Sequence, residues 1–184
     1  MVPATDSTTE GETNAEQAAD DSRTAERVDA EPEWPDLSFT LYIRPGASTV
    51  TKDRQSQIQD RFEQLEDIAV IDDLTVEQWS KEVDVPSEGS ATDQAAVDLF
   101  DEFKEAVEPI DARLTPFFEE RPQVSSFLSR STTDRIIVFP VLGVTVRRDD
   151  DLVGLYPCWR DGFHYSVGDC LDMLEDGDSV ANLV

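Results

Sequence analysis

The chain contains very few of the residues that most enzymes use for chemistry. Among its 184 residues are three lysines, two cysteines and one histidine, and its glycines form no phosphate-binding loop. So few side chains that could bind a metal or act as a nucleophile argue against a metal or thiol enzyme. No apolar run reaches the roughly 18 residues of a membrane-spanning helix, and no secretory leader is visible. We therefore expect a cytoplasmic protein with reduced cysteines and no cofactor.

Acidic residues dominate the charge of the chain. There are 41 aspartates and glutamates against 15 basic residues, which gives a net charge of -26. Such an imbalance is typical of a disordered chain, an acidic interaction protein or a folded protein of an extreme halophile. Disorder does not fit most of the chain, because 39% of the residues are hydrophobic and they recur periodically. Molar salt shortens the Debye length to about 3 Å and screens the repulsion, so we favour the halophile explanation.

Composition divides the chain into three parts. Residues 1–34 are acidic and nearly free of large apolar side chains, so too little apolar surface is available to offset the entropy of ordering them. We expect this part to be a disordered acidic tail. Residues 35–176 carry periodic apolar positions and are predicted to form a single domain, and residues 177–184 are predicted to be a C-terminal tail.

The most apolar stretch runs from Arg135 to Trp159. Its first half is rich in β-branched residues up to Val146, and a second apolar run covers Leu152–Tyr156. The short polar segment Arg147–Asp151 between them has the length and composition of a turn. The stretch therefore predicts a β-hairpin whose apolar side chains must be covered by the rest of the domain.

The remaining elements follow from hydrophobic spacing. Alternation over Leu37–Ile43 predicts a strand, and a further strand is expected near Leu74 and Val76. Apolar spacing at i, i+4 and i+7 predicts a helix over about 52–67, and a second helix is expected from an N-cap at Thr92 to near residue 109. Ser166 resembles the first residue of a capping box and predicts a third helix.

This order of elements predicts an α+β fold. The simplest arrangement is a two-layer sandwich, in which three helices pack on a mixed or antiparallel sheet of about four strands. The hairpin in the C-terminal third supplies two of those strands.

The first candidate is a zinc site. Cys158, His164 and Cys170 are spaced C-x5-H-x5-C, and thiolate with imidazole suits zinc. Structural zinc ligands usually come in pairs two to four residues apart, and no such pair is present. The simpler interpretation is that both cysteines are small core residues, so no metal ligand is assigned.

A DNA-contacting helix was the second candidate. The first predicted helix combines basic and amide side chains, which are the types that read DNA. They are Lys52, Arg54, Gln55, Gln57 and Arg61. The second helix carries many carboxylates that would repel phosphate.

A protein interface was the third candidate. Five aromatic residues are of the types found as anchors at interfaces. They are Trp79, Phe117, Phe118, Tyr156 and Trp159. The alternative is that most of them fill the core of the domain itself.

Several segments between about Ser38 and Glu175 form a recognisable set, including TLYIRPGAS, LTVEQWSKEV and SVGDCLDML. In these segments the chain resembles a haloarchaeal family of small acidic proteins labelled helix-turn-helix domain proteins. The similarity is most specific at Pro116–Glu119, Ser125–Ser126 and Pro157–Cys158. The resemblance implies a halophilic protein and raises the question of DNA binding, but it brings no catalytic residues.

Together these features favour a cytoplasmic, non-enzymatic regulatory or protein-interaction module. Its expected partner is another protein or a second copy of the chain, with no membrane contact. The alternative is a DNA-binding transcriptional regulator of the helix-turn-helix type. A zinc- or thiol-dependent enzyme is a distant third.

Overall fold

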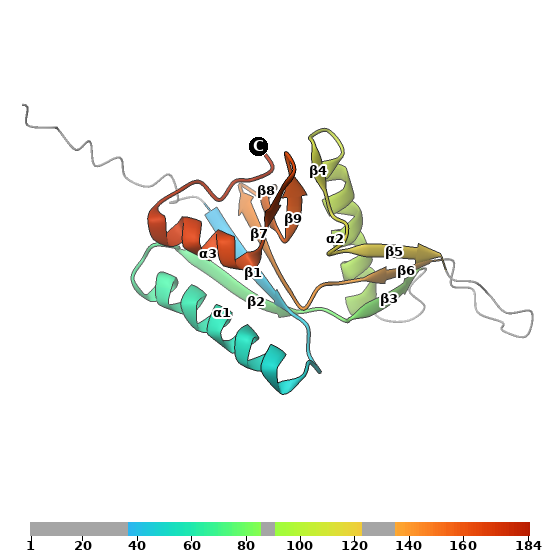
Figure 1. Ribbon diagram of the computed structural model, residues 1–184, viewed down its shortest axis with the longest axis horizontal. Helices are drawn as coiled ribbons and strands as arrows, with labels where there is room; N and C mark the ends of the chain where they lie inside the picture. Colours follow the sequence, from blue (N-terminus) through green and yellow to red (C-terminus); the bar gives the residue numbers. More distant parts are fainter. Residues whose placement is uncertain (1–36, 86–90, 123–134) are drawn as a thin grey trace, which may run out of the picture. The chain divides into compact units, whose positions relative to one another are not determined.

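The computed structural model describes residues 37–85, 91–122 and 135–184 (Figure 1). The predicted acidic tail at 1–34 lies outside the described residues. The same is true of Ser125–Ser126 and of the short strand or turn expected at Val124–Leu128.

A four-stranded mixed sheet, the main sheet, organises the domain. Its strand order is β2-β1-β7-β8. β1 (Leu37–Ile43) pairs in parallel with β2 (Asp73–Gln78) and antiparallel with β7 (Leu142–Arg148). β7 continues through a tight turn into the antiparallel β8 (Asp151–Tyr156). The predicted hairpin is therefore present, and it forms half of the main sheet.

Two helices cover one side of the main sheet. α1 (Thr49–Asp67) follows β1, and its N-cap Ser48 accepts a hydrogen bond from the backbone of Thr51. α3 (Val167–Asp176) begins at Ser166, where the predicted capping box is present. Both helices bury their apolar stripes against the main sheet.

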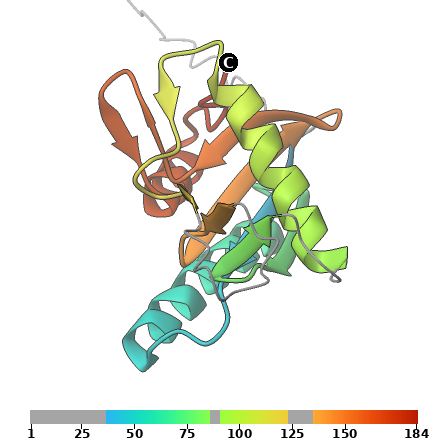
Figure 2. The ribbon, with the colours of Figure 1, turned by 90° about the vertical axis from the view of Figure 1, so that its right-hand side faces the viewer.

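The other side of the main sheet is covered by α2 (Ala91–Val107) and a second sheet. Figures 1 and 2 show α2 on the side of the main sheet opposite α1. The second sheet has the order β3-β6-β5 and contains Glu82–Val85, Arg135–Val138 and Glu119–Pro122.

A third, small sheet lies beside the C-terminal end of the chain. It contains β4 (Ala112–Arg113), β9 (Cys158–Arg160) and β10 (Phe163–Tyr165) in the order β10-β9-β4. All of its pairings are antiparallel.

Alternation along β1 explains why the domain has two cores. Leu41 belongs to the core shared with α1 and α3, whereas the next residue, Tyr42, belongs to the core shared with α2. Successive side chains of a strand point to opposite faces, so β1 contributes side chains to a core on each face of the main sheet. The predicted α+β class, the mixed four-stranded sheet and the three helices are confirmed. The prediction of two layers differs from the structure, because α2 packs on the side of the main sheet opposite α1 and α3.

The apolar run before the hairpin turn was predicted to be one strand, and this prediction is wrong. The run breaks at Pro140 into β6 and β7, and β6 pairs with β3 and β5 in the second sheet. Proline has no backbone N–H and interrupts a hydrogen-bonded ladder.

The predicted start of the second helix also differs from the structure. α2 already begins at Ala91, so Thr92 lies inside the helix and is not its N-cap.

The last residues of the chain, predicted to be a tail, contact β8. Val180 and Leu183 are buried, and the backbone N–H of Leu183 donates to the carbonyl of Val153. The side chain of Asn182 donates to the carbonyl of Leu155 and accepts from its N–H.

No helix in the described part of the chain is long and apolar enough to cross a membrane.

Candidate functional site

The two cysteines are core residues. Cys158 and Cys170 are fully buried, and burial raises the pKa of both thiols, that of Cys158 to about 11. Both are therefore protonated at neutral pH. His164 is exposed, and no three His, Cys, Asp or Glu side chains in the described residues form a group that could hold a metal ion. The structure does not bring Cys158, His164 and Cys170 together as a ligand set.

Three of the five predicted interface aromatics also lie in the core. Trp79, Phe118 and Tyr156 are at most 4% exposed. The indole N–H of Trp79 donates to the carbonyl of Pro140 at 2.9 Å, and the hydroxyl of Tyr156 donates to the carbonyl of Val180 at 2.8 Å. Burial raises the pKa of Tyr156 far above its ordinary value. The polar atoms of Trp79 and Tyr156 are satisfied inside the domain, and all three side chains are buried.

The other two aromatics lie on one face of the small sheet. The ring of Phe117 stacks on His164 at 4.6 Å with an interplanar angle of 18°, and Trp159 lies 5.9 Å from His164. Arg113 and His164 are the cross-strand partners of Trp159 on either side, so these side chains share one face. We call Arg113, Phe117, Trp159 and His164 the aromatic face.

Two of the predicted DNA-contacting residues are used by the fold. Gln55 is 5% exposed, and its amide donates to the carbonyls of Arg44 and Val141 at 2.9 and 2.8 Å. The guanidinium of Arg61 bonds Asp172 and Glu175 of α3, both at 2.8 Å. The hydrogen bond to Asp172, followed by the contact with Glu175, raises the pKa of Arg61. Gln55 joins α1 to the main sheet, and Arg61 joins α1 to α3.

The remaining predicted residues are exposed, and two of them lie on one stripe of α1. Val50, Arg54 and Gln57 follow each other at i, i+4 and i+7, which places them on the same face of a helix. Val50 is 79% exposed, an unusual position for a large apolar side chain, and Arg54 and Gln57 are exposed beside it. We call these three residues the α1 stripe. Lys52 is exposed on a different flank, because residues two apart do not share a face.

Charge also distinguishes the start of α1 from the other helices. The first turn of α1 has no acidic residue, and Asp53 is the single acid within residues 49–57, against Lys52 and Arg54. α2 has one lysine among several acids, and α3 has four acids and no basic residue. Of the three helices that the structure describes, only the N-terminal half of α1 carries more basic than acidic side chains.

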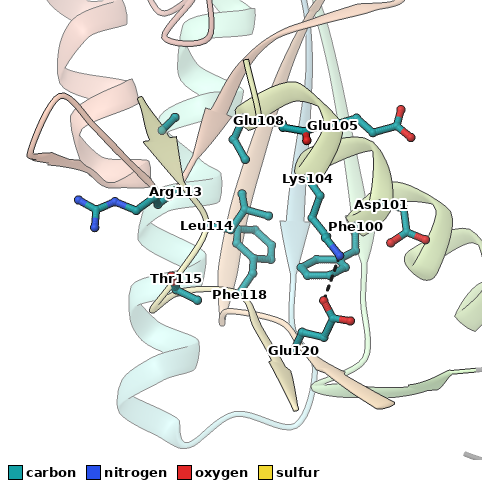
Figure 3. Close-up of a pocket in the computed structure, with 12 residues that line it drawn as sticks. Phe100, Asp101, Lys104, Glu105, Glu108, Arg113, Leu114, Thr115, Phe118 and Glu120 are labelled. Atoms are coloured by element: carbon teal, nitrogen blue, oxygen red, sulfur yellow. Dashed lines mark hydrogen bonds and ion pairs between the residues drawn. The ribbon is translucent and has the colours of Figure 1, made fainter. Parts of the chain in front are cut away.

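A groove of about 640 Å³ lies between α2 and the segment from Ala112 to Glu120 (Figure 3). Phe100, Leu114 and Phe118 meet at its centre, and Arg113 points away from them. These three side chains are buried members of the core shared with α2. The groove therefore has an apolar floor that is continuous with that core.

Ion pairs occupy one end of the groove. The ammonium of Lys104 lies 5.7 Å from the ring centre of Phe100 and 3.1 Å from a carboxylate oxygen of Glu120. Arg135 contacts the other oxygen of Glu120 at 2.6 Å and Asp101 at 3.4 Å. The hydrogen bond from Arg135, and then that from Lys104, lower the pKa of Glu120 although its partial burial opposes them.

Sequence patterns did not reveal the groove or the α1 stripe. The groove brings together segments that lack a common motif. The stripe could have been found, because the spacing that placed Ile58, Phe62 and Leu65 on the buried face also places Gln55 there and Arg54 outside it.

The structure shows no two consecutive helices joined by a short turn within residues 37–85, 91–122 and 135–184. α1 and α2 are separated by β2 and β3, and α3 follows β10. A tandem pair of helices, in which the second enters the major groove, is therefore not the arrangement of the three helices described.

Comparison with known protein families places most of the chain in a family. Residues 33–179 match a family described as "Helix-turn-helix domain". No curated protein and no solved structure matches the chain. Because the match covers most of the 184 residues, the chain belongs to this helix-turn-helix domain family.

Proposed function

We propose that the protein is a non-enzymatic regulator that contacts duplex DNA through the N-terminal half of α1. The α1 stripe is the observation that carries this proposal. Arginine bonds guanine, glutamine bonds adenine, and small apolar groups contact the methyl group of thymine in the major groove. Val50, Arg54 and Gln57 supply one of each type on one exposed stripe. Family membership supports the same function, which the sequence alone placed second.

Lys52 has a separate role in this proposal. It lies on another flank of α1, where its ammonium would contact a phosphate and not a base. Phosphate contacts position a protein on DNA, and base contacts specify the sequence. The net charge of -26 opposes any approach to DNA, so binding depends on a local surface that is free of acids. The start of α1 comes nearest to such a surface among the described helices, because Asp53 is the single acid within residues 49–57.

Selection from a pool of random duplexes, followed by fluorescence anisotropy over a salt series, tests the proposal. Arg54→Ala is expected to cost about 1–3 kcal/mol on the selected sequence and to relax the preference at one base pair. Lys52→Ala is expected to weaken binding to all sequences and to lower the salt slope by about one. The matched controls are Arg121→Ala and Lys81→Ala, whose side chains are 57% and 65% exposed far from α1 in sequence.

Two outcomes would remove this proposal. The first is that no duplex is enriched at any salt concentration at which the protein is folded. The second is that the control variants weaken binding as much as Arg54→Ala and Lys52→Ala, which would indicate a dependence on net charge alone.

The aromatic face favours a second function, self-association. Trp159 and Phe117 are half-buried and His164 is exposed, and aromatic side chains with arginine are enriched at interfaces. In this proposal the aromatic faces of two copies pack together. Sedimentation at increasing concentration is expected to show a dimer that Trp159→Ser dissociates. A monomer at all concentrations would exclude a homodimer formed by this face.

A further inference from the structure

The last residues of the chain lie along β8 in the way that an additional strand would. Figure 1 shows this segment beside β8 and β9. The carboxamide of Asn182 bonds the N–H and the carbonyl of Leu155 at 2.9 and 3.0 Å. The N–H of Leu183 donates to the carbonyl of Val153 at 2.9 Å. β8 is the outermost strand of the main sheet, so the segment occupies bonding groups that an edge strand otherwise presents for pairing.

Two side chains of the segment complete the two cores of the domain. Val180 belongs to the core shared with α1 and α3, and Leu183 belongs to the core shared with α2. The carbonyl of Val180 accepts a hydrogen bond from the hydroxyl of Tyr156 at 2.8 Å. A Cβ on Gly154 would come within 2.6 Å of the same carbonyl. The close approach of the segment to β8 therefore depends on the absence of a side chain at Gly154.

β9 also binds the segment. The guanidinium of Arg160 donates to the carbonyls of Asn182 and Val184 at 2.5 and 3.0 Å. The carboxamide of Asn182 lies 3.4 Å from the sulfur of Cys158, and both residues are buried. Asn182 is therefore part of the cover over the Cys158 thiol.

None of these contacts belongs to the ladders that build the three sheets. β8 is paired with β7, and β9 is paired with β4 and β10. Residues 177–184 form neither helix nor strand, and the joint to α3 at residues 177–179 is exposed. Segments that open locally are those with few buried contacts outside the regular elements. Release of the segment would break no strand pairing.

From this arrangement we propose that residues 179–184 form a strap, which opens while the rest of the domain stays folded. The closed strap covers Cys158 and the edge of β8. The open strap exposes both, and the N–H and carbonyl of Leu155 are then free to pair with an extended segment, as exposed sheet edges do. The strap thus controls access to β8, whether or not α1 contacts DNA.

Native-state thiol labelling measures the opening, because the chain has two cysteines and they lie under different elements. Cys170 is buried on α3 in the core shared with α1 and serves as the internal reference for unfolding of the whole domain. The full-length protein is treated with N-ethylmaleimide at a salt concentration at which it is folded. Mass spectrometry gives the rate at each cysteine, which is divided by the rate in the unfolded chain.

Cys158 is expected to react at least about tenfold faster than Cys170, since local opening requires less free energy than global unfolding. A Cys158 that reacts no faster than Cys170 would overturn the proposal.

Two pairs of variants test whether the strap is the part that moves. Leu183→Ser removes a buried side chain of the strap and is expected to raise the Cys158 rate about tenfold or more. Val184→Ser is its control, because that side chain is 72% exposed. Arg160→Ala removes the bonds to the strap carbonyls and is expected to raise the rate about tenfold, with Arg113→Ala on the same small sheet as its control. No rise in either strap variant above its control would overturn the proposal.

A variant away from the strap separates local opening from global unfolding. Phe39→Leu weakens the packing of β1 on α1, which stays in place when the strap opens. It is expected to raise the Cys170 rate about fivefold and to leave the Cys158 rate unchanged. An equal rise at both cysteines would show that Cys158 is exposed only when the whole domain unfolds, and would contradict the proposal.

Discussion

The two sides of the main sheet are packed by different means. The side under α1 and α3 is mainly aliphatic, with the Phe39–Phe62 pair at 6.5 Å. The side under α2 contains six buried aromatic rings, and each lies close to another: Tyr42, Trp79, Phe100, Phe103, Phe118 and Phe139. Half of the rings in the second core lie outside helices and strands, namely those of Trp79, Phe118 and Phe139.

This difference in packing coincides with a difference in surface. The exposed face of α1, over the aliphatic core, carries the α1 stripe. The aromatic core extends to the surface at the groove, where Phe100 and Phe118 line the floor. Aromatic side chains combine a large apolar area with ring faces that attract cations. The proposed DNA contact therefore lies on the side of the aliphatic core, and the groove lies on the side of the aromatic core.

The largest effect on stability is expected at Gly143, which contacts the aromatic core. A Cβ on this residue would overlap the indole of Trp79, with Cζ2 only 2.8 Å away. Trp79 cannot move easily, because Tyr42 is stacked on it at 4.8 Å and Phe139 lies at 5.0 Å. Overpacking of this kind costs about 3 kcal/mol, so Gly143→Ala is expected to destabilise the protein by about that amount in urea unfolding.

Gly168 provides the control on the other side of the sheet. A Cβ there meets only the hydroxyl of Ser166, at 3.4 Å, and alanine is favoured over glycine in a helix by about 0.5–1 kcal/mol. Gly168→Ala is expected to be neutral or stabilising. Similar losses in both variants would show that the Trp79 cluster is not specially constrained.

A second prediction compares one phenylalanine from each core. Phe118 lies within 6.5 Å of the rings of Trp79, Phe100, Phe103 and Phe139, whereas Phe39 has one ring neighbour. Each aromatic pair contributes about 0.5–1.5 kcal/mol beyond burial. Phe118→Leu is therefore expected to lower the free energy of unfolding by about 2 kcal/mol or more, and Phe39→Leu by about 1 kcal/mol. Equal losses would mean that ring geometry contributes nothing particular to the second core.

A third prediction concerns the start of α3 and is sensitive to pH. Burial raises the pKa of Asp169, but hydrogen bonds from the side chain and backbone of Ser166 outweigh it, so the folded pKa lies below the ordinary value. The capping contribution of Asp169 is therefore complete above the unfolded pKa and is lost as the pH falls through the folded pKa.

Asp169→Asn is the variant that measures this contribution. It is expected to cost about 1 kcal/mol at neutral pH. The difference from the wild type should shrink as the pH falls below about 4. Chemical unfolding of both proteins at several pH values measures it, and a difference that does not change with pH would argue against the capping role.

The smallest effect is expected at Arg61. Although it contacts two carboxylates of α3, its side chain is 35% exposed and those of its partners are 65% and 44% exposed. Exposed ion pairs contribute about 0.2–1 kcal/mol, so Arg61→Ala is expected to lower stability by about 0.5 kcal/mol. Arg54→Ala is expected to leave stability unchanged. The two variants therefore distinguish Arg61, which stabilises the fold, from Arg54, which is proposed to contact DNA.

Regular periodicity made the aliphatic core predictable from the sequence. Alternation placed β1 correctly at Leu37–Ile43, and the predicted helix at 52–67 corresponds to Thr49–Asp67. The aromatic core was less predictable, because Trp79, Phe118 and Phe139 lie outside helices and strands and follow no period. Pro140 was present as a signal that the apolar run ends, but the length of that run suggested a single strand.

The candidate sites were predicted only in part. Gln55 and Arg61 have side chains of the types that contact DNA. Their types alone do not show that Gln55 is buried or that Arg61 pairs with α3. Those roles depend on β7 and α3, which are distant in sequence. The groove depends in the same way on α2 meeting the segment that ends at Glu120.

The most direct test of the DNA proposal is a map of the contact surface. Backbone amide shifts of the protein can be followed by NMR while the selected duplex is added at fixed salt. We predict that the largest changes occur in residues 49–57, with little change in α2 or the second sheet. Changes centred on α2 or on the aromatic face, with residues 49–57 unaffected, would contradict the proposal that α1 is the DNA-contacting helix.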